Sequence, residues 1–245
     1  EVAKEAADMV IADDRFASIV DAVEEGRGIF DNVRKSLGYL LGGNVGELAV
    51  MLLATLSGTP LPLLPVQLLW INLVTDGLPA LALATDPIDP DVLSRPPRRA
   101  AAPLTDRRLV VSVLLAGCFT AGVTFGVFLY ELRMGSGVAT ARNAAFSVLV
   151  ISELLRAFGE RSETRSVWQV GLLSNVRLFL VVAGSFALQL VIHHSSPLET
   201  FFQTEPISLG QCAAWIGLGS VPLALLELRK LVMRRRRLPA REGES

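Results

Sequence analysis

The chain has 245 residues, of which 51% are hydrophobic and 19% charged, and its net charge of −1 says little about partners. Its two cysteines both lie within long apolar runs and support no disulfide or zinc framework. A simple soluble domain is also excluded, because the apolar residues gather into runs about as long as a bilayer is thick.

Six runs reach the roughly 20 mostly apolar residues that a spanning helix needs. We therefore predict an all-α, multi-pass integral membrane protein with six transmembrane helices and the lipid bilayer as a partner. The expected division is a soluble start at 1–36, a transport domain at 37–233 and a basic tail at 234–245. The expected spans are 37–57, 63–84, 109–132, 141–158, 176–192 and 207–228.

The basic residues predict the orientation of these spans. Six spans place both termini on one side, and basic residues accumulate in cytoplasmic segments. With cytoplasmic termini, 21 of the 23 lysines and arginines lie on the cytoplasmic side. The arginines at 234–237 are expected to anchor the last helix at an anionic membrane surface, and we expect no nucleic-acid partner.

The segment before the first span predicts a strand at 7–13 and a helix at 18–36. One strand and one helix cannot bury a core of their own, so we interpret 1–36 as a short α/β remnant of a larger domain. The helix continues into the first span without a proline, which predicts one rigid rod from the soluble part into the membrane.

Three carboxylates lie deep within the predicted spans, where charged groups are costly and usually mark an ion path. They are Glu47, Asp76 and Glu153. Asn44 precedes Glu47 by three residues, so both side chains are expected on the same helix face.

The second span combines more oxygen donors with helix-weakening residues. Asn72, Thr75 and Asp76 have the spacing of one helix face, and Pro79 frees the carbonyl of Thr75. Together with the other carboxylates and Asn44 they form a set of hard oxygen ligands. This set suits Ca²⁺, and Mn²⁺ is also compatible. The alternative is interhelical hydrogen bonding with one protonated carboxyl.

Several strings resemble the type II P-type ATPases, specifically the sarcoplasmic-reticulum-type calcium pumps and their bacterial relatives. The close match covers roughly 2–100, and beyond it the resemblance depends on the number of spans and on the string around Glu153. The matching strings are Met-Val-Ile-Ala-Asp-Asp at 9–14, Ala-Val-Glu-Glu-Gly-Arg at 22–27, Asn-Val-Gly-Glu at 44–47, Pro-Val-Gln-Leu-Leu-Trp-Ile-Asn-Leu-Val-Thr-Asp-Gly-Leu-Pro-Ala at 65–80 and a segment at 91–98 ending in Arg-Pro-Pro-Arg.

The resemblance implies that the six spans are the family's fifth to tenth, and that 1–36 ends its phosphorylation domain. It also implies one calcium site with Asn44, Glu47, Thr75, Asp76 and Glu153 as ligands, and a second with Asn72 and Asp76. The family's phosphorylated aspartate and nucleotide domain do not occur in this sequence. ATP and Mg²⁺ would therefore act only in missing N-terminal pump domains, and whether the chain alone is an enzyme stays open. We expect a fragment or one half of a split gene.

We accordingly expect the C-terminal transmembrane part of an ATP-driven pump that translocates Ca²⁺. The alternatives are a pump of the same family for Mn²⁺ or another cation, and a stand-alone, non-catalytic membrane protein or passive cation channel.

Three further features leave alternatives open. Arg156, one turn after Glu153, could neutralise that carboxylate and remove one calcium site, or reach the cytoplasmic surface. Gly122 and Gly126 predict close packing of the third span, against the first. Asp86, Asp89 and Asp91 could attract cations toward an entry path or form a solvated turn.

Overall fold

The structure is a computed structural model that describes residues 5–7, 10, 15–97 and 104–237, with side chains as far as residue 234. Every regular element in these ranges is helical, which confirms the prediction of an all-α membrane protein. The predicted strand at 7–13 and the end of the predicted tail lie largely outside the described residues.

The six predicted spans all correspond to helices. Five are long and apolar enough to cross a membrane, and the sixth candidate is a helix pair bent by 93°. The spans are α2 (Phe16–Leu56), the run α3, η1 and α4 (Pro65–Trp70, Ile71–Asp76 and Gly77–Ala84), α5 (Arg107–Arg133), α6 (Val138–Gly159), α8 (Val176–Ile192) with α9 (Ser196–Phe202), and α10 with α11 (Leu209–Gly219 and Val221–Arg237). Short helices connect them: η2 (Val92–Ser94), α7 (Val167–Val170) and η3 (Leu172–Ser174).

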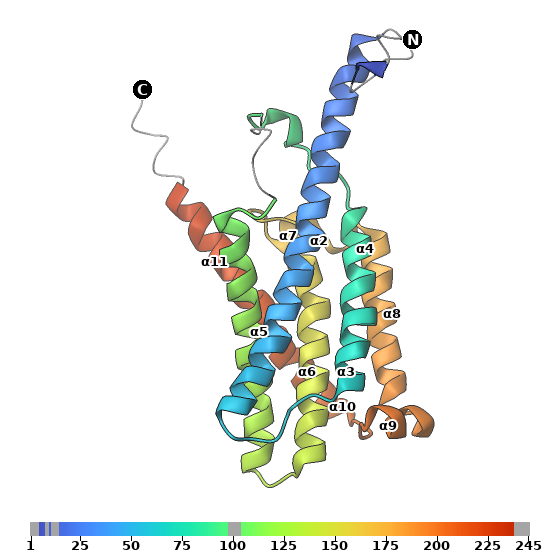
Figure 1. The fold of residues 1–245 in the computed structure, drawn as a ribbon, viewed down its shortest axis with the longest axis vertical. Coiled ribbons are helices and arrows are strands. Elements are labelled where there is room, and N and C mark those ends of the chain that lie inside the picture. The colour runs from blue at the N-terminus through green and yellow to red at the C-terminus, as the bar shows by residue number, and fades with distance from the viewer. Residues whose placement is uncertain (1–4, 8–9, 11–14, 98–103, 238–245) are drawn as a thin grey trace.

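The helix α2 is continuous over 41 residues, as the missing proline predicts. At about 1.5 Å per residue it is roughly 60 Å long, about twice the thickness of a bilayer's hydrocarbon core. Its first half therefore projects beyond the other spans (Figure 1). A single continuous helix thus connects the projecting part of the chain to the bundle.

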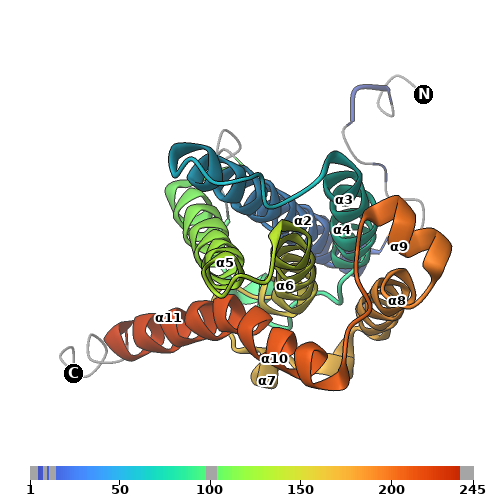
Figure 2. The same ribbon diagram turned by 90° about the horizontal axis from the view of Figure 1, so that it is seen from below.

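The helix α6 forms the centre of the bundle. It is apolar on nearly all sides, and 72% of its most hydrophobic window is buried, against 22–44% for the other long spans. A helix that is hydrophobic all round belongs in the interior. Viewed along the bundle, α6 lies among α2, α4, α5, α8 and α10 (Figure 2). A polar side chain on α6 is thus held inside the protein and away from lipid.

A glycine allows the close crossing of α2 and α5, but it is not one of the two that the sequence predicted, Gly122 and Gly126. A Cβ on Gly122 or Gly126 would meet nothing within 4 Å, so the prediction that they make the close contact is wrong. Instead, a Cβ on Gly117 would lie 2.5 Å from Val45 Cγ1 and 2.9 Å from the backbone nitrogen of Gly46. The backbones of α2 and α5 therefore approach closely about one and a half to two and a half turns earlier along α5 than the sequence indicates.

A buried ion-pair cluster, here called the Asp86 junction, joins α2 to three other segments. The Asp86 carboxylate accepts from Lys35 of α2 (2.9 Å), from Arg161 after α6 (2.9 Å) and from Asn175 at the start of α8 (2.8 Å). Asn32 of α2 donates to the Asp86 backbone carbonyl at 2.6 Å. The Asp86 and Arg161 side chains are only 3% and 4% exposed. The junction thus fixes α2 against the loops at one end of the bundle.

The two neighbouring aspartates are also paired. Asp89 accepts from Arg95 and from Arg165, and Asp91 forms an ion pair with Arg95. The hydrogen bond from Arg95 lowers the pKa of Asp91 below its ordinary value. The prediction of a simple solvated turn is therefore wrong for Asp86, which is buried, whereas Asp91 is 64% exposed. All three aspartates have cationic partners, and whether they attract cations toward an entry path stays a prediction.

Candidate cation site

Three carboxylates from three different spans converge in the bundle. Glu47 of α2, Asp76 of η1 and Glu153 of α6 are all buried. One carboxylate oxygen from each lies within 4.8 Å of the others. These are the three acidic residues that the sequence places deep within the spans.

The local structure of α2 explains how the carboxylates come so close. A Cβ on Gly43 would lie 2.7 Å from an Asp76 oxygen and 3.2 Å from a Glu153 oxygen, so only glycine leaves them this space. Tyr39, Gly43 and Glu47 are spaced four residues apart and share one face of α2. That face supplies one carboxylate and the room for two more.

A π-helical turn positions Asp76. The second span widens into this turn over Ile71–Asp76, directly before Gly77. Single π turns within α-helices occur frequently at functional sites. The Tyr39 hydroxyl donates to the Thr75 carbonyl at 2.6 Å. The carbonyl that Pro79 was expected to free is therefore occupied by a tyrosine that the sequence analysis missed, although its four-residue spacing from Gly43 and Glu47 signals it.

Two of the three carboxylates, Asp76 and Glu153, concentrate negative charge in the site. Within the described residues, no donor lies within hydrogen-bond distance of any carboxylate oxygen of Asp76 or Glu153. Two ionised carboxylates at 4.8 Å repel each other by about 3.5 kcal/mol at an effective dielectric constant of about 20. A bound cation or shared protons would relieve this repulsion, and carboxylate oxygens are suitable ligands for hard divalent cations.

The predicted amide and hydroxyl ligands, Asn44, Asn72 and Thr75, do not all point into the site. The Asn72 side chain is exposed, but its amide donates to Glu47 at 3.1 Å. The Thr75 hydroxyl donates to the Ile71 carbonyl of its own helix at 2.9 Å. Asn44 is exposed on α2, and no hydrogen bond joins its side chain to another described residue. The expected common face is thus divided: Thr75 and Asp76 point inward while Asn72 lies at the edge, because the π turn changes the angular spacing between them.

Arg156 is fully buried beside the carboxylates, so the prediction that it reaches the surface is wrong. It donates to the Tyr39 carbonyl at 2.9 Å, its guanidinium lies 4.7 Å from the centre of the Tyr39 ring, and it pairs with Glu160 at 3.4 Å. Within the described ranges no ion pair joins it to Glu153. Its effect on the number of bound ions stays a prediction.

Comparison with known proteins identifies the family. The model for "Cation transporting ATPase, C-terminus" matches residues 60–232. A calcium-transporting ATPase of Bacillus subtilis is 42% identical over 227 residues, which are 92% of this chain and 25% of that protein. The human calcium-transporting ATPase type 2C member 1 is 37% identical over 96% of this chain and 26% of its own length. A probable cation-transporting ATPase F of Mycobacterium tuberculosis is 40% identical over 92% of this chain and 24% of its length.

The chain thus spans about a quarter of the length of these relatives. The matched region begins before the second span and continues into α11, so it covers the central helix α6 and two of the three clustered carboxylates. This chain belongs to the cation transporting ATPase family and corresponds to the family's C-terminal membrane region.

Proposed function

We propose that this chain is the ion-translocating membrane part of an ATP-driven pump for Ca²⁺. The observation that carries the proposal is the group of Glu47, Asp76 and Glu153, which converge from three spans with no hydrogen-bond donor at the last two within the described residues. The names of the relatives from Bacillus subtilis and human support calcium as the transported ion.

The chemistry of the proposed ligands supports the same choice. Carboxylate, amide, hydroxyl and carbonyl oxygens suit Ca²⁺, which takes six to eight oxygen ligands in flexible geometry. Mn²⁺ accepts similar ligands and is the second candidate. Glu47, Asp76 and Glu153 are the proposed centre of the site. Asn72 is proposed as a ligand at its edge, and Asn44 and Thr75 after a change of side-chain orientation.

The proposed site is open on one side. Asn44 and Asn72 are exposed there, beside the buried Glu47. Exposed polar groups at membrane depth favour a polar partner. We therefore propose that further segments of the pump cover this edge and complete the coordination. ATP and Mg²⁺ would bind in those further domains, away from the helices described above.

The proposed transport cycle uses α2 as the mechanical connection. With both termini in the cytoplasm, the projecting half of α2 faces the domains that would use ATP. A displacement of these domains would move α2, and with it Glu47, against Asp76 and Glu153. Separating the carboxylates weakens their joint hold on the cation, and each conformation must bind the ion with a different affinity for such coupling to work. After release, the carboxylates would take up protons.

The test is calcium binding by the complete pump that contains this chain. The variants E47Q, D76N and E153Q should each bind ⁴⁵Ca²⁺ about tenfold or more weakly, because each loses a charged ligand. E131Q, at the far end of α5, is a control with the same chemical change. If the three site variants kept the affinity of E131Q, the site assignment would be wrong.

Two further measurements separate the alternatives. Uptake of Ca²⁺ by vesicles should require ATP, whereas ATP-independent flux would indicate a channel. Equal uptake rates for Mn²⁺ and Ca²⁺ at equal concentration would refute a preference for calcium.

A further inference from the structure

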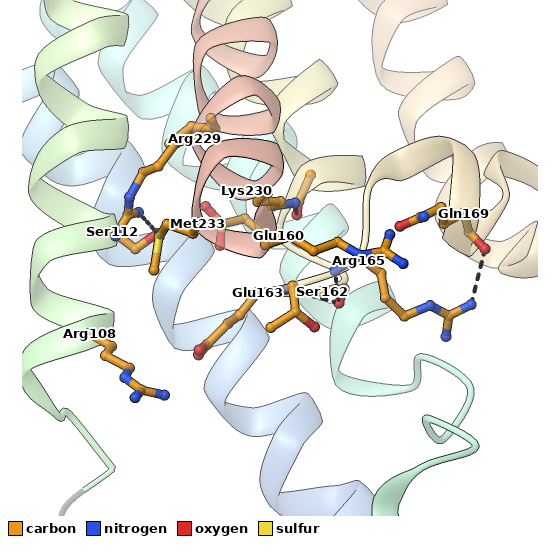
Figure 3. Close-up of a pocket in the computed structure, with 14 residues that line it drawn as sticks. Arg108, Ser112, Glu160, Ser162, Glu163, Arg165, Gln169, Arg229, Lys230 and Met233 are labelled. Atoms are coloured by element: carbon orange, nitrogen blue, oxygen red, sulfur yellow. Dashed lines mark hydrogen bonds between the residues drawn. The ribbon is translucent and has the colours of Figure 1, made fainter. Parts of the chain in front are cut away.

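A polar cavity lies where α5, α6 and α11 reach one end of the bundle. Its volume is about 560 Å³, and it is lined by residues of these helices and of the loop after α6 (Figure 3). It is separate from the three carboxylates of the proposed cation site.

The charge of this cavity is strongly unbalanced. Its lining contains two acidic residues, Glu160 and Glu163, and five basic ones: Arg108, Arg165, Arg229, Lys230 and Arg234. The larger neighbouring cavity, of about 970 Å³, has six acidic and six basic residues in its lining. Only the smaller of these two cavities therefore offers net positive charge to a ligand.

The unpaired charges in the cavity are also positive. Glu160 pairs with Arg156, and Glu163 pairs with Arg34. By contrast, Arg108 and Arg234 have no hydrogen bond or ion pair with any described residue, and Arg229 donates only to the neutral hydroxyl of Ser112, at 3.3 Å. The carboxylates are thus occupied, while three guanidinium groups have no anionic partner among the residues that the structure describes. Guanidinium groups bind phosphate with charge-assisted and often bidentate hydrogen bonds.

The position of the cavity favours a lipid phosphate. Arg108 immediately precedes the apolar part of α5, and Arg229 immediately follows the apolar part of α11. On the membrane side of these arginines, both helices present exposed apolar side chains: Val110, Val111 and Leu114 on α5, and Leu225 and Leu228 on α11. Acyl chains can lie along such surfaces while the headgroup reaches the arginines. The same combination of basic groups and adjacent apolar surface would not be needed for a free anion.

We propose that this cavity binds the headgroup of an anionic glycerophospholipid, with Arg108 and Arg229 as the principal phosphate contacts. The bound lipid joins α5 to α11. This last helix belongs to the least buried of the long spans, so it gains most from an added bridge. The proposal goes beyond ion transport, and its test does not depend on which ion the chain carries.

The test is native mass spectrometry of the detergent-purified, full-length protein that contains this chain. The variant R108Q/R229Q should retain phosphatidylglycerol about tenfold less well than the parent, because it loses two charge-assisted contacts. The control R107Q/R177Q removes the same charge from two exposed arginines outside the cavity and should bind like the parent. R108K/R229K keeps the charge and should retain most of the binding, which excludes misfolding as the cause of the loss.

Three results would overturn the proposal. Equal losses in R108Q/R229Q and R107Q/R177Q would indicate attraction by general surface charge. Equal retention of phosphatidylcholine and phosphatidylglycerol by the parent would show that the headgroup charge is not recognised. Displacement of phosphatidylglycerol by excess inorganic phosphate would show that the cavity takes a free anion in preference to a lipid.

Discussion

The Asp86 junction allows a quantitative test of how α2 is held. The substitution D86N replaces the carboxylate between Lys35 and Arg161 with a neutral amide of the same shape. Both cations are then left without their anionic partner while 12% and 4% exposed. Removing one partner of a buried ion pair destabilises a protein by about 3–5 kcal/mol. We expect D86N to lose about 3 kcal/mol of folding stability, the lower end of this range, because an amide oxygen can still accept one hydrogen bond.

The matched control is D91N, which makes the same change five residues away. Asp91 is 64% exposed and pairs with a single arginine, so its loss should cost less than about 1 kcal/mol. Thermal unfolding followed by tryptophan fluorescence measures both variants. At about 2–4 °C per kcal/mol, D86N should unfold about 6–12 °C below the parent and D91N less than about 4 °C below it. Equal midpoints for the two variants would refute the argument that the junction holds α2.

The remaining predictions concern glycine and pH. G117A should lower the midpoint of thermal unfolding, because a Cβ at 2.5 Å from Val45 Cγ1 forces α2 and α5 apart. The control G122A should leave the midpoint unchanged within error, because a Cβ there meets nothing within 4 Å. A larger effect of G122A than of G117A would contradict the helix crossing. G43A should weaken ⁴⁵Ca²⁺ binding by the complete pump about tenfold, because its methyl group takes the space of a carboxylate oxygen, and undiminished binding would argue against the site. Because Arg95 lowers the pKa of Asp91, their pair stabilises the folded state above pH 3.8 and is lost as the pH falls below it. The small midpoint difference between the parent and D91N should accordingly disappear below pH 3.8, and a constant difference would be evidence against the pair.

The sequence predicted the spans well, because a bilayer requires a simple pattern that can be read directly from the sequence. Each crossing needs a long apolar run, and all six runs correspond to helices. The continuity of α2 was also predictable from the absence of proline between its soluble and apolar parts. The convergence of Glu47, Asp76 and Glu153 was expected from their depth within the spans and from the resemblance to calcium pumps, and the structure brings one oxygen of each within 4.8 Å of the others.

Properties that depend on neighbouring helices were not predictable in the same way. The spacing of Asn72, Thr75 and Asp76 indicated one common face, but the π turn over Ile71–Asp76 divides it, and a regular helical periodicity does not include such a turn. The position of Arg156 near the end of its span favoured contact with water, but α6 is the central helix, and Arg156 is fully buried.

The packing glycines illustrate the same limit. Gly122 and Gly126 form the familiar small-residue pattern, whereas Gly117 makes the contact. Which face of α5 meets α2 depends on the rotation of both helices in the bundle, and the sequence of one helix does not contain that information.

The unbroken helix between Lys35 and Glu47 places a constraint on how this sequence can change. Both residues lie on one rigid helix, with one fixed in the Asp86 junction and the other among the carboxylates. Inserting a single residue between them would rotate Glu47 by about 100° around the axis relative to Lys35 and move it by about 1.5 Å. Insertions and deletions should therefore be excluded from this stretch, even where substitutions are tolerated.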